Sequence, residues 1–350
     1  MKAAVFNKVG NITIEEWEKP AVGPDEYLLK VRAAALCGSD LRTYEHGHPK
    51  ISKPTVLGHE FAGDVVAVGA NITGVKVGDR VSVHPGIPCG HCWYCERGWQ
   101  NLCEDRKNLG IHYPGAFAEY ILIPGKTLEV GTCVKIPDSI SYEVAALGDP
   151  VVSALNGQEV IDARLGDEIL ILGAGPIGIL HGLIAKAKGA SKVILANRSG
   201  KRLKMAEKTG CADYYFDLSK DGDLKAFVGS VTSMGRGPNK VVVANTAVAS
   251  ARQAVEVVAK GGTVLLFAGF PKDAPQLDVD GNLIHYRQLT VTSSYGSTPR
   301  QFHLAEQMLF DGKIDGEALI THRLPLEEIN EGFKLMQTSD ALKVIIDFDK

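Results

Sequence analysis

The chain lacks any long hydrophobic run and any marked excess of charge of one sign. No apolar stretch approaches the roughly 20 residues that span a bilayer, and 38 basic against 41 acidic residues leave a formal net charge of −3. Charge so nearly balanced argues against the strongly basic surfaces with which proteins bind nucleic acids or anionic membranes. We therefore expect a small molecule as the partner, with no nucleic acid and no membrane.

The first residues also lack the apolar core of an export signal. The segment MKAAVFNKVG leads directly into strand-like sequence. This pattern predicts a cytoplasmic protein, in which thiols stay reduced. The seven cysteines of such a chain are more typical of metal binding than of disulfides.

Two different patterns of secondary structure share the 350 residues, a length sufficient for two domains. Up to about residue 150, short apolar strands such as 3–6, 27–36, 63–70 and 79–86 are separated by turn residues, which indicates a twisted β domain. From about Gly166, strands alternate with glycine turns and helices, as in a parallel sheet with crossover helices. The predicted fold class is therefore α/β with a separate β-rich part.

Four of the cysteines lie close together in the stretch CGHCWYCERGWQNLC. They follow the spacing C-x2-C-x2-C-x7-C, and the residues are Cys89, Cys92, Cys95 and Cys103. Zinc takes four sulfur ligands at about 2.3 Å, and short steps let neighbouring thiolates reach one ion. A closed shell of this kind predicts a structural zinc site, with a redox cluster or a disulfide pair as the alternatives. The separate Cys133 and Cys211 are expected to be buried as small apolar side chains.

A glycine-rich turn joins the strand EILIL to a helix that is expected to begin near Pro176. Gly173, Gly175 and Gly178 form G-x-G-x-x-G here, with Ile177 beside the last glycine. In this context the glycines permit a tight turn, a close approach of pyrophosphate to the backbone, and close packing of helix on strand. The segment predicts dinucleotide binding, with the phosphates at the helix N-terminus.

The end of the next strand, KVILANR, bears on the choice of dinucleotide. NAD-binding chains usually place an acidic residue here to accept hydrogen bonds from the ribose, whereas this chain has Asn197. The residues that follow are Arg198, Ser199, Lys201 and Arg202. Because such a cluster attracts a 2′-phosphate, we predict NADP(H) in preference to NAD(H). Alternatively, Arg198 and Arg202 belong to the solvated start of a helix, and the chain does not discriminate.

A second set of potential metal ligands lies in the β-rich part. Cys37 in the sequence CGSD is followed about twenty residues later by His59 and Glu60. A thiolate, an imidazole and a carboxylate are ligand types of a catalytic zinc, which keeps one position open. Taken as bare residue types, Cys37 and His59 are more typical of a buried thiol and a core histidine than of a metal site.

With these motifs in this order, the chain resembles the zinc-dependent medium-chain alcohol dehydrogenases, and within them the sorbitol (polyol) and threonine dehydrogenase branch. The resemblance extends over essentially the whole chain. It rests on CGSD, YEHG, VLGHEFAGDVVAVG, GDRV, the four-cysteine loop, GAFAEY, LGAGPIGIL and THRLPLEEINEGF.

The resemblance implies a GroES-like, β-rich catalytic domain and a Rossmann domain with a doubly wound parallel sheet. The catalytic zinc-binding domain would comprise residues 1–152 and 292–350, and the dinucleotide-binding domain residues 153–291. Members of this family often form tetramers, so a homo-oligomer, either a tetramer or a dimer, is expected.

The resemblance also assigns roles to individual residues. Cys37, His59 and Glu60 match the ligands of the catalytic zinc, and Asp149 matches an acidic residue that approaches the metal directly or through water. Ser39 matches the hydroxyl that passes on the substrate proton, with Glu60 as a possible next carrier. The expected cofactors are two zinc ions, one catalytic and one structural, and NADP(H).

The implied activity is hydride transfer between a secondary alcohol of a polyol, free or phosphorylated, and NAD(P). Cationic contacts to a phosphorylated substrate could come from Arg42, His46, His48 or Lys50, which otherwise form an ordinary surface loop. The alternative substrates are L-threonine or a simple secondary alcohol or diol. A remoter alternative is a nucleotide-binding relative without zinc chemistry, which would be expected to lack Cys37, His59 and Asp149.

Overall fold

The computed structural model describes residues 1–338 and 340–349, and by contacts the chain divides into two compact units. Unit 1 comprises Met1–Val152 and the residues from Gly296 onward, and unit 2 comprises Ser153–Tyr295. The domain boundaries expected from the sequence have their second junction at residue 292, four residues before this one. The function assigned to each domain remains a prediction.

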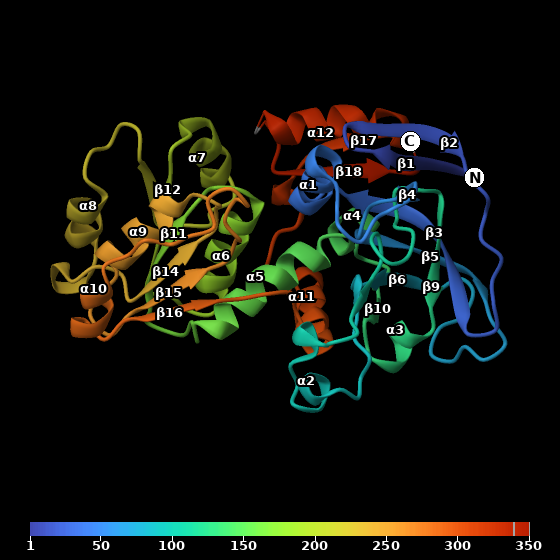
Figure 1. Ribbon diagram of the computed structural model, residues 1–350, viewed down its shortest axis with the longest axis horizontal. Helices are drawn as coiled ribbons and strands as arrows, with labels where there is room; N and C mark the ends of the chain where they lie inside the picture. Colours follow the sequence, from blue (N-terminus) through green and yellow to red (C-terminus); the bar gives the residue numbers. More distant parts are fainter. Residues whose placement is uncertain (339, 350) are drawn as a thin grey trace. The chain divides into compact units, whose positions relative to one another are not determined.

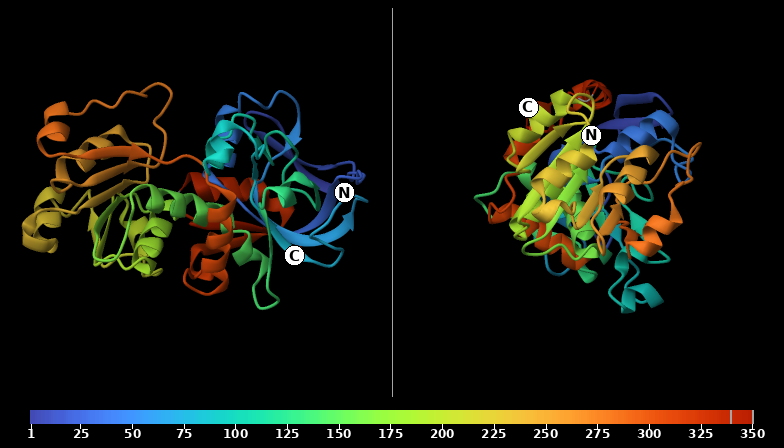
Figure 2. Two further views of the ribbon diagram at one scale, coloured as in Figure 1. Left: turned by 90° about the horizontal axis from the view of Figure 1, so that it is seen from below. Right: turned by 90° about the vertical axis from the view of Figure 1, so that its left-hand side faces the viewer.

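Unit 1 is built mainly from antiparallel strands. Its main sheet has the order β10-β6-β5-β3-β18-β17, with β9 also paired to β3, and β2-β1-β4 form a separate sheet. The last strand of the chain is antiparallel to β3 and aligns Ile345 with Ala35, so the C-terminal segment completes a sheet begun near the N-terminus (Figure 2). The strands are β1 (Lys2–Lys8), β2 (Asn11–Glu16), β3 (Glu26–Ala35), β4 (Thr55–Val56), β5 (Glu60–Val68), β6 (Arg80–Val83), β7 (Gly86–Ile87), β8 (Lys107–Asn108), β9 (Tyr120–Pro124), β10 (Cys133–Lys135), β17 (Ile320–Leu324) and β18 (Lys343–Asp347).

Short helices connect and cover these strands. The longest of those lying wholly in unit 1 is α11, which begins with a capping box at Thr298 and Gln301 and has a proline in its first turn. The helices are α1 (Gly38–His46), α2 (Trp93–Glu96), α3 (Lys126–Glu129), α4 (Tyr142–Ala145), α11 (Pro299–Phe310) and α12 (Ile329–Gln337), and α5 (Gly148–Val160) continues from unit 1 into unit 2.

Unit 2 is a six-stranded parallel sheet of order β13-β12-β11-β14-β15-β16. The strand order reverses at β11, so right-handed crossovers place α6 and α7 on one face and α9 on the other; Figure 1 shows helices on both sides of the sheet. Its elements are β11 (Glu168–Leu172), α6 (Pro176–Ala187), β12 (Lys192–Asn197), α7 (Gly200–Glu207), β13 (Tyr214–Asp217), α8 (Leu224–Val231), β14 (Lys240–Val243), α9 (Val248–Val257), β15 (Thr263–Leu266), α10 (Gly281–Tyr286) and β16 (Thr290–Ser293).

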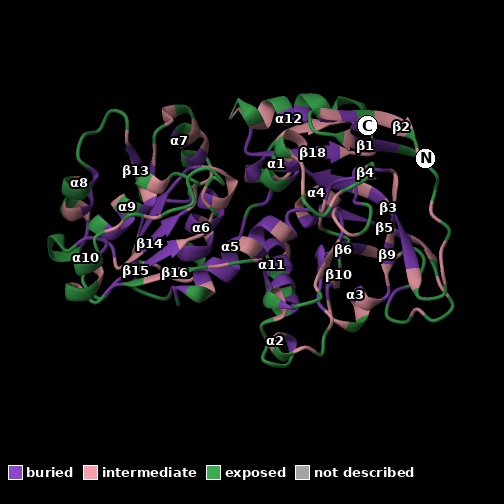
Figure 3. Ribbon diagram, in the orientation of Figure 1, coloured by how far each residue is buried: buried purple, intermediate pink, exposed green. Residues whose placement is uncertain are grey.

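Each unit has its own apolar core, concentrated in its strands (Figure 3). All five residues of β11 are buried, as expected for a central parallel strand covered on both faces. The expected burial of the two separate cysteines is correct for Cys211 but wrong for Cys133, which is only partly buried. Cys133 lies on β10 at the edge of its sheet, where one side of the strand has no neighbour. Within the described residues, no helix is both long and apolar enough to cross a membrane.

Candidate active site and metal centres

The start of α1 brings a thiol and an imidazole together in unit 1. Cys37 caps this helix, and the Asp40 carboxylate accepts a hydrogen bond from the Cys37 N–H at 3.1 Å. The other oxygen of Asp40 lies 3.2 Å from Nδ1 of His59. This contact favours a proton on Nδ1 and leaves the Nε2 lone pair free, the state in which a histidine binds a metal.

Ligand atoms of Cys37, His59 and Glu60 all lie within 4.8 Å of one another. Glu60 is buried, and its Oε1 has no hydrogen-bond partner within the described residues, while its Oε2 pairs with Lys343. A buried carboxylate oxygen without a partner is strongly unfavourable, and a cation bound between these three residues would satisfy it. The cluster therefore fits a metal ion.

The charges of this cluster are mutually dependent. Burial opposes ionisation of the Cys37 thiol, but His59 and Lys343 outweigh it and lower the thiol pKa to about 7. Burial likewise disfavours a charged His59, yet the carboxylate of Asp40 and the thiolate raise its pKa well above the usual value. Burial dominates at Glu60 and raises its pKa to about 8. A divalent cation would favour the deprotonated form of all three groups.

Asp149, in the first turn of α5, lies beside this cluster rather than within it. Its Oδ2 is 4.0 Å from His59 Nε2, and its Oδ1 is 3.7 Å from His84 Nε2. Burial raises the pKa of Asp149 to about 6. Asp149 is thus an acidic side chain within reach of a metal held by Cys37 and His59, either directly or through water.

Ser39 lies at the open side of the histidine. Its Oγ is 3.3 Å from His59 Nε2, the nitrogen left free by Asp40. The Ser39 hydroxyl thus lies beside the His59 nitrogen that would bind a metal.

Two other polar groups lie around the cluster, His84 and Lys343. From the sequence, His84 could equally line the site or pack in the core, and nothing pointed to Lys343. His84 is buried; its Nδ1 lies 3.0 Å from the Gly86 nitrogen and 3.1 Å from the Gly86 carbonyl oxygen, and its Nε2 lies 2.7 Å from Ser297 Oγ. Burial lowers the pKa of His84 to about 3, which keeps it neutral. Lys343 is on β18, more than 280 residues from Glu60, so no local sequence pattern could connect the two.

The four-cysteine loop forms a second cluster in unit 1. The sulfur atoms of Cys89, Cys92, Cys95 and Cys103 all lie within 4.8 Å of one another, and no cysteine forms a disulfide. Cys89 Sγ and Cys95 Sγ are 3.9 Å apart, about twice a disulfide bond of ~2.05 Å. This spacing fits four thiolates around one ion better than a disulfide pair.

In unit 2, the glycine-rich turn lies between β11 and α6. A Cβ on Gly178 would come within 1.8 Å of the Gly173 carbonyl oxygen, so only glycine permits this helix to pack so close to the turn. Gly173 itself has φ 122°, in the region that favours glycine. Gly175 caps α6, Pro176 is its first residue, and Ile177 follows. The helix N-terminus and this open backbone fit a pyrophosphate group.

The residues predicted to contact the ribose lie next to this turn. The Asn197 side chain accepts the N–H of Ala174 at 3.3 Å and donates to the Ser199 carbonyl at 3.2 Å. Arg202 Nη1 lies 3.2 Å from where a Cβ of Gly175 would be. Arg198 is exposed just before α7. The structure thus brings these residues, which are distant in sequence from the glycines, to the same edge of the sheet.

Comparisons with known proteins agree with this geometry. Residues 23–138 match the model of the alcohol dehydrogenase GroES-like domain, and residues 176–311 match that of the zinc-binding dehydrogenases. An L-threonine 3-dehydrogenase from Mesorhizobium japonicum is 34% identical, and the alignment covers 99% of each chain. The chain belongs to the zinc-dependent medium-chain alcohol dehydrogenases. It is thus an oxidoreductase that acts on alcohols with zinc and a nicotinamide cofactor.

Solved structures of this family show the same fold. A protein described as a zinc-binding dehydrogenase from Sinorhizobium meliloti 1021, bound to NADP, is 30% identical with a TM-score of 0.91, covering 99% of this chain and 98% of that one. An alcohol dehydrogenase from Escherichia coli CFT073, complexed with NADH, is 30% identical with a TM-score of 0.90 and 99% coverage of both chains. Galactitol-1-phosphate dehydrogenase from Escherichia coli is 25% identical with a TM-score of 0.88, covering 99% and 100%.

Proposed function

We propose that this enzyme oxidises a secondary hydroxyl group of a polyol, reversibly, with NADP preferred over NAD. The observation that carries the proposal is the cluster of Cys37, His59 and Glu60, whose ligand atoms lie within 4.8 Å of one another beside the Ser39 hydroxyl. This arrangement offers a metal three ligand types while a proton acceptor lies next to the open side.

Each residue has a distinct role in the proposed site. Cys37 and His59 hold the metal, and Glu60 or Asp149 supplies the acidic ligand. Zinc held there would supply Lewis-acid chemistry at the substrate hydroxyl, and a bound nicotinamide would accept hydride. Ser39 relays the proton of the substrate hydroxyl, accepting it while passing its own proton on to water or to Glu60. Asp40 keeps the His59 ring in the metal-binding tautomer through its contact with Nδ1.

The substrate class follows from what the relatives' substrates share. L-threonine and galactitol 1-phosphate, named for two relatives, both offer a secondary hydroxyl next to a carbon that carries another polar group. The CGSD and YEHG motifs are among those that resemble the joint polyol and threonine dehydrogenase branch, and within it we propose a hydroxyl as this second group. L-threonine 3-dehydrogenase activity is the alternative, supported by the 34% identity over the whole chain.

Purified protein should be assayed with NAD⁺ and NADP⁺ on sorbitol, xylitol, galactitol, L-threonine and 2,3-butanediol, with zinc determined on the same sample. The proposal expects polyol oxidation with about two zinc ions per chain. Cys37→Ser should lose most activity and one zinc, whereas Cys211→Ser, changed at a buried thiol in unit 2, should keep both. Oxidation of L-threonine alone would support the alternative, L-threonine 3-dehydrogenase activity.

The preference for NADP needs its own variant. Arg198→Ala should lower kcat/KM for NADP⁺ about tenfold or more through loss of a charge-assisted bond, and leave NAD⁺ nearly unchanged. Lys208→Ala removes an exposed cation just beyond the end of α7 and serves as the control. Equal losses with both cofactors, or equal losses in both variants, would contradict the assignment.

A further inference from the structure

Unit 1 contains a cavity of about 780 Å³ whose charged lining is entirely basic. It lies between the segment 50–55, which connects α1 to β4, and the segment 107–114, with Trp17 on one side. Its charged and titratable lining residues are Lys50, Lys53, Lys107 and His112, and the lining includes no aspartate or glutamate. Neither Lys50 nor Lys53 forms an ion pair with a carboxylate within the described residues, whereas Lys107 pairs with Asp105 at 2.6 Å. Such a lining attracts an anion.

Lys50 and His112 face one another with two hydrogen-bond donors, and an anion between them would accept from both. Nδ1 of His112 accepts the Asn108 N–H at 2.9 Å, so the proton of the neutral ring is on Nε2. That Nε2 lies 3.4 Å from the Lys50 ammonium, which has donors only. Two donors therefore face one another. Burial and the neighbouring lysines also lower the pKa of His112, so the ring stays neutral and the mismatch persists. An oxyanion oxygen between the two groups would accept from both.

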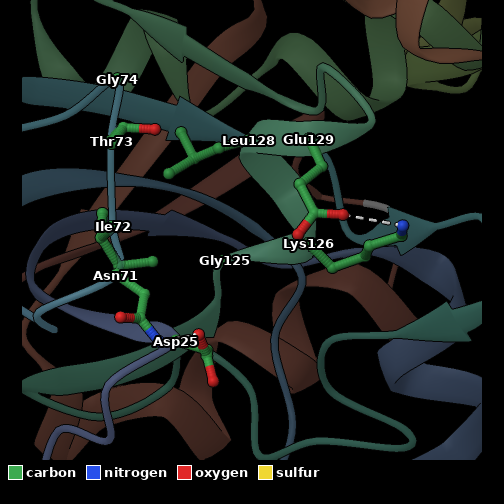
Figure 4. A pocket seen from close by; sticks show the side chains of 9 residues that line it. All are labelled: Asp25, Asn71, Ile72, Thr73, Gly74, Gly125, Lys126, Leu128 and Glu129. Carbon is green, nitrogen blue, oxygen red and sulfur yellow. Dashed lines mark hydrogen bonds and ion pairs between the residues drawn. The ribbon is translucent and has the colours of Figure 1, made fainter.

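A second cavity of unit 1 serves for comparison, because its lining contains no pair of facing donors of this kind. It has a volume of about 410 Å³ and lies between the loop 71–74 and α3 (Figure 4). There Lys126 pairs with Glu129 at 2.8 Å, and Asn71 donates to Asp25 at 2.7 Å. Its one lysine is therefore paired with a carboxylate, and the lining also holds Asp25, so it is less suited to an anion.

The basic cavity lies close to the proposed metal site. Thr55, in its wall, precedes His59 by four residues, so the two Cα atoms are at most about 14 Å apart. The other wall approaches the same point, because a Cβ on Gly110 would lie 3.0 Å from the carbonyl oxygen of Gly58. Both walls thus converge on the residue that precedes the histidine.

We propose that this cavity binds the phosphate group of a phosphorylated polyol substrate, with Lys50, Lys53 and His112 as the donors. The inference rests on the proposed polyol dehydrogenase function and narrows its substrate class. Phosphate monoesters carry a charge near −2 at neutral pH and offer three acceptor oxygens, which suits two ammonium groups and one ring N–H. The phosphate contributes to substrate binding and takes no part in the reaction, so we expect it to lower KM and leave kcat nearly unchanged.

The test compares D-sorbitol 6-phosphate with D-sorbitol, using the zinc-loaded enzyme and saturating NADP⁺. Wild-type enzyme should have a KM at least about tenfold lower for the phosphate ester, the gain expected from charge-assisted bonds. Lys50→Gln/Lys53→Gln should abolish this preference and change kcat/KM for sorbitol less than twofold. Lys126→Gln, in the cavity of Figure 4, is the matched control and should behave as wild type.

Binding measured by ³¹P NMR titration of D-sorbitol 6-phosphate tests the cavity independently of turnover. Binding that is lost in the double lysine variant and kept in Lys126→Gln supports the cavity as a phosphate site. If L-threonine were nevertheless the only substrate oxidised, the proposed polyol function would fail, and with it the assignment of this phosphate to a substrate. Polyol oxidation with no preference for the phosphate ester would overturn the proposal and leave the polyol function intact. A lower KM for D-gluconate than for the phosphate ester would also overturn it. So would binding of inorganic phosphate without a lower KM for the phosphate ester than for sorbitol.

Discussion

Glu306 on α11 is a buried carboxylic acid, and the nearby Ser82 only partly offsets the effect of burial on its pKa. It is fully buried, neither oxygen has a hydrogen-bond partner within the described residues, and it packs against Gly148 in the first turn of α5. Burial raises its pKa to about 8, so the folded protein holds it protonated at neutral pH. Nothing in the sequence around Glu306 predicts this, because a glutamate in a helix is ordinarily solvated.

This carboxyl group should make stability fall as pH rises. The unfolded chain releases the proton near pH 4.5 and the folded chain near pH 8, so between these values the folded state binds more protons. Glu306→Gln should remove this part of the slope and stabilise the protein at pH 8.5 relative to wild type by on the order of 2–5 kcal/mol. Urea unfolding at pH 5.5 and 8.5 would measure it.

A suitable control for that experiment is Glu331→Gln, which changes an exposed carboxylate on α12 that pairs with Lys334. It should leave the pH dependence unchanged within about 0.5 kcal/mol. If wild type and Glu306→Gln lose stability equally between pH 5.5 and 8.5, the buried acid is not protonated in the folded state.

For single residues, the sequence predicted site residues where the ligand type and the spacing of a motif leave few alternatives. It did not predict those whose partners are distant in the chain. Cys37, His59 and Glu60 could be grouped from residue type and family motifs, and the structure brings their ligand atoms together. The contacts of His84 with Asp149 and of Lys343 with Glu60 could not be predicted, because each joins segments that are far apart in the chain.

Among the elements, the loop 89–103 relies on contacts between its side chains to keep its folded conformation. It contains one helix of four residues and one 3-10 turn, too little regular structure to fold by itself. Backbone hydrogen bonds lower the pKa of the Cys92 thiol to about 6, whereas burial raises that of Cys95 to about 12. Without a cation, therefore, the four thiols would not all be ionised at neutral pH.

Cys95→Ser should accordingly release one zinc per chain and unfold this loop locally. Trp93 and Trp99, whose ring centroids are 5.8 Å apart, would separate, so tryptophan fluorescence should change and limited proteolysis should cut within 89–103. Cys133→Ser, at a partly buried cysteine outside the loop, should release no zinc. An unchanged zinc content in Cys95→Ser would rule out a four-thiolate site.

The turn between β11 and α6 is the second element with a sharp requirement. Gly178→Ala would place a methyl group 1.8 Å from the Gly173 oxygen, and α6 would have to move away from the strand. We expect the Kd for NADPH to rise about tenfold or more and stability to fall by about 1–3 kcal/mol. Both are measurable by cofactor fluorescence titration and urea unfolding.

The same unit offers a matched glycine. Gly229 lies inside α8, and a Cβ there would meet only the Gly235 oxygen at an ordinary 3.6 Å. Gly229→Ala should therefore be neutral or stabilising by up to about 1 kcal/mol, with cofactor affinity unchanged. Similar losses in both variants would mean that the tight approach of helix and strand does not matter for binding.

On the scale of the whole molecule, the change of pattern near residue 166 was the strongest sequence signal. Alternating strands and helices predict a parallel sheet, and unit 2 has one. The register of unit 1 was beyond such reasoning, because β3 pairs with β5, β9 and β18 at once. Pairings of this kind depend on contacts between remote segments, which short-range patterns do not encode.

Because the proposed metal ligands all lie in unit 1 and the dinucleotide turn in unit 2, each ligand should stabilise mainly its own unit. At 100 times its Kd, NADP⁺ adds about 2.7 kcal/mol to the state that binds it. Amide exchange in β11 and α6 should then slow by up to about 100-fold, with little change in β5 and the loop 89–103. Zinc removal by 1,10-phenanthroline should speed exchange in that loop and around Cys37 while β11 stays protected. Equal protection of both units by NADP⁺, or equal exposure of both by the chelator, would mean that they unfold as one cooperative body and that the ligands cannot be assigned to separate units by this means.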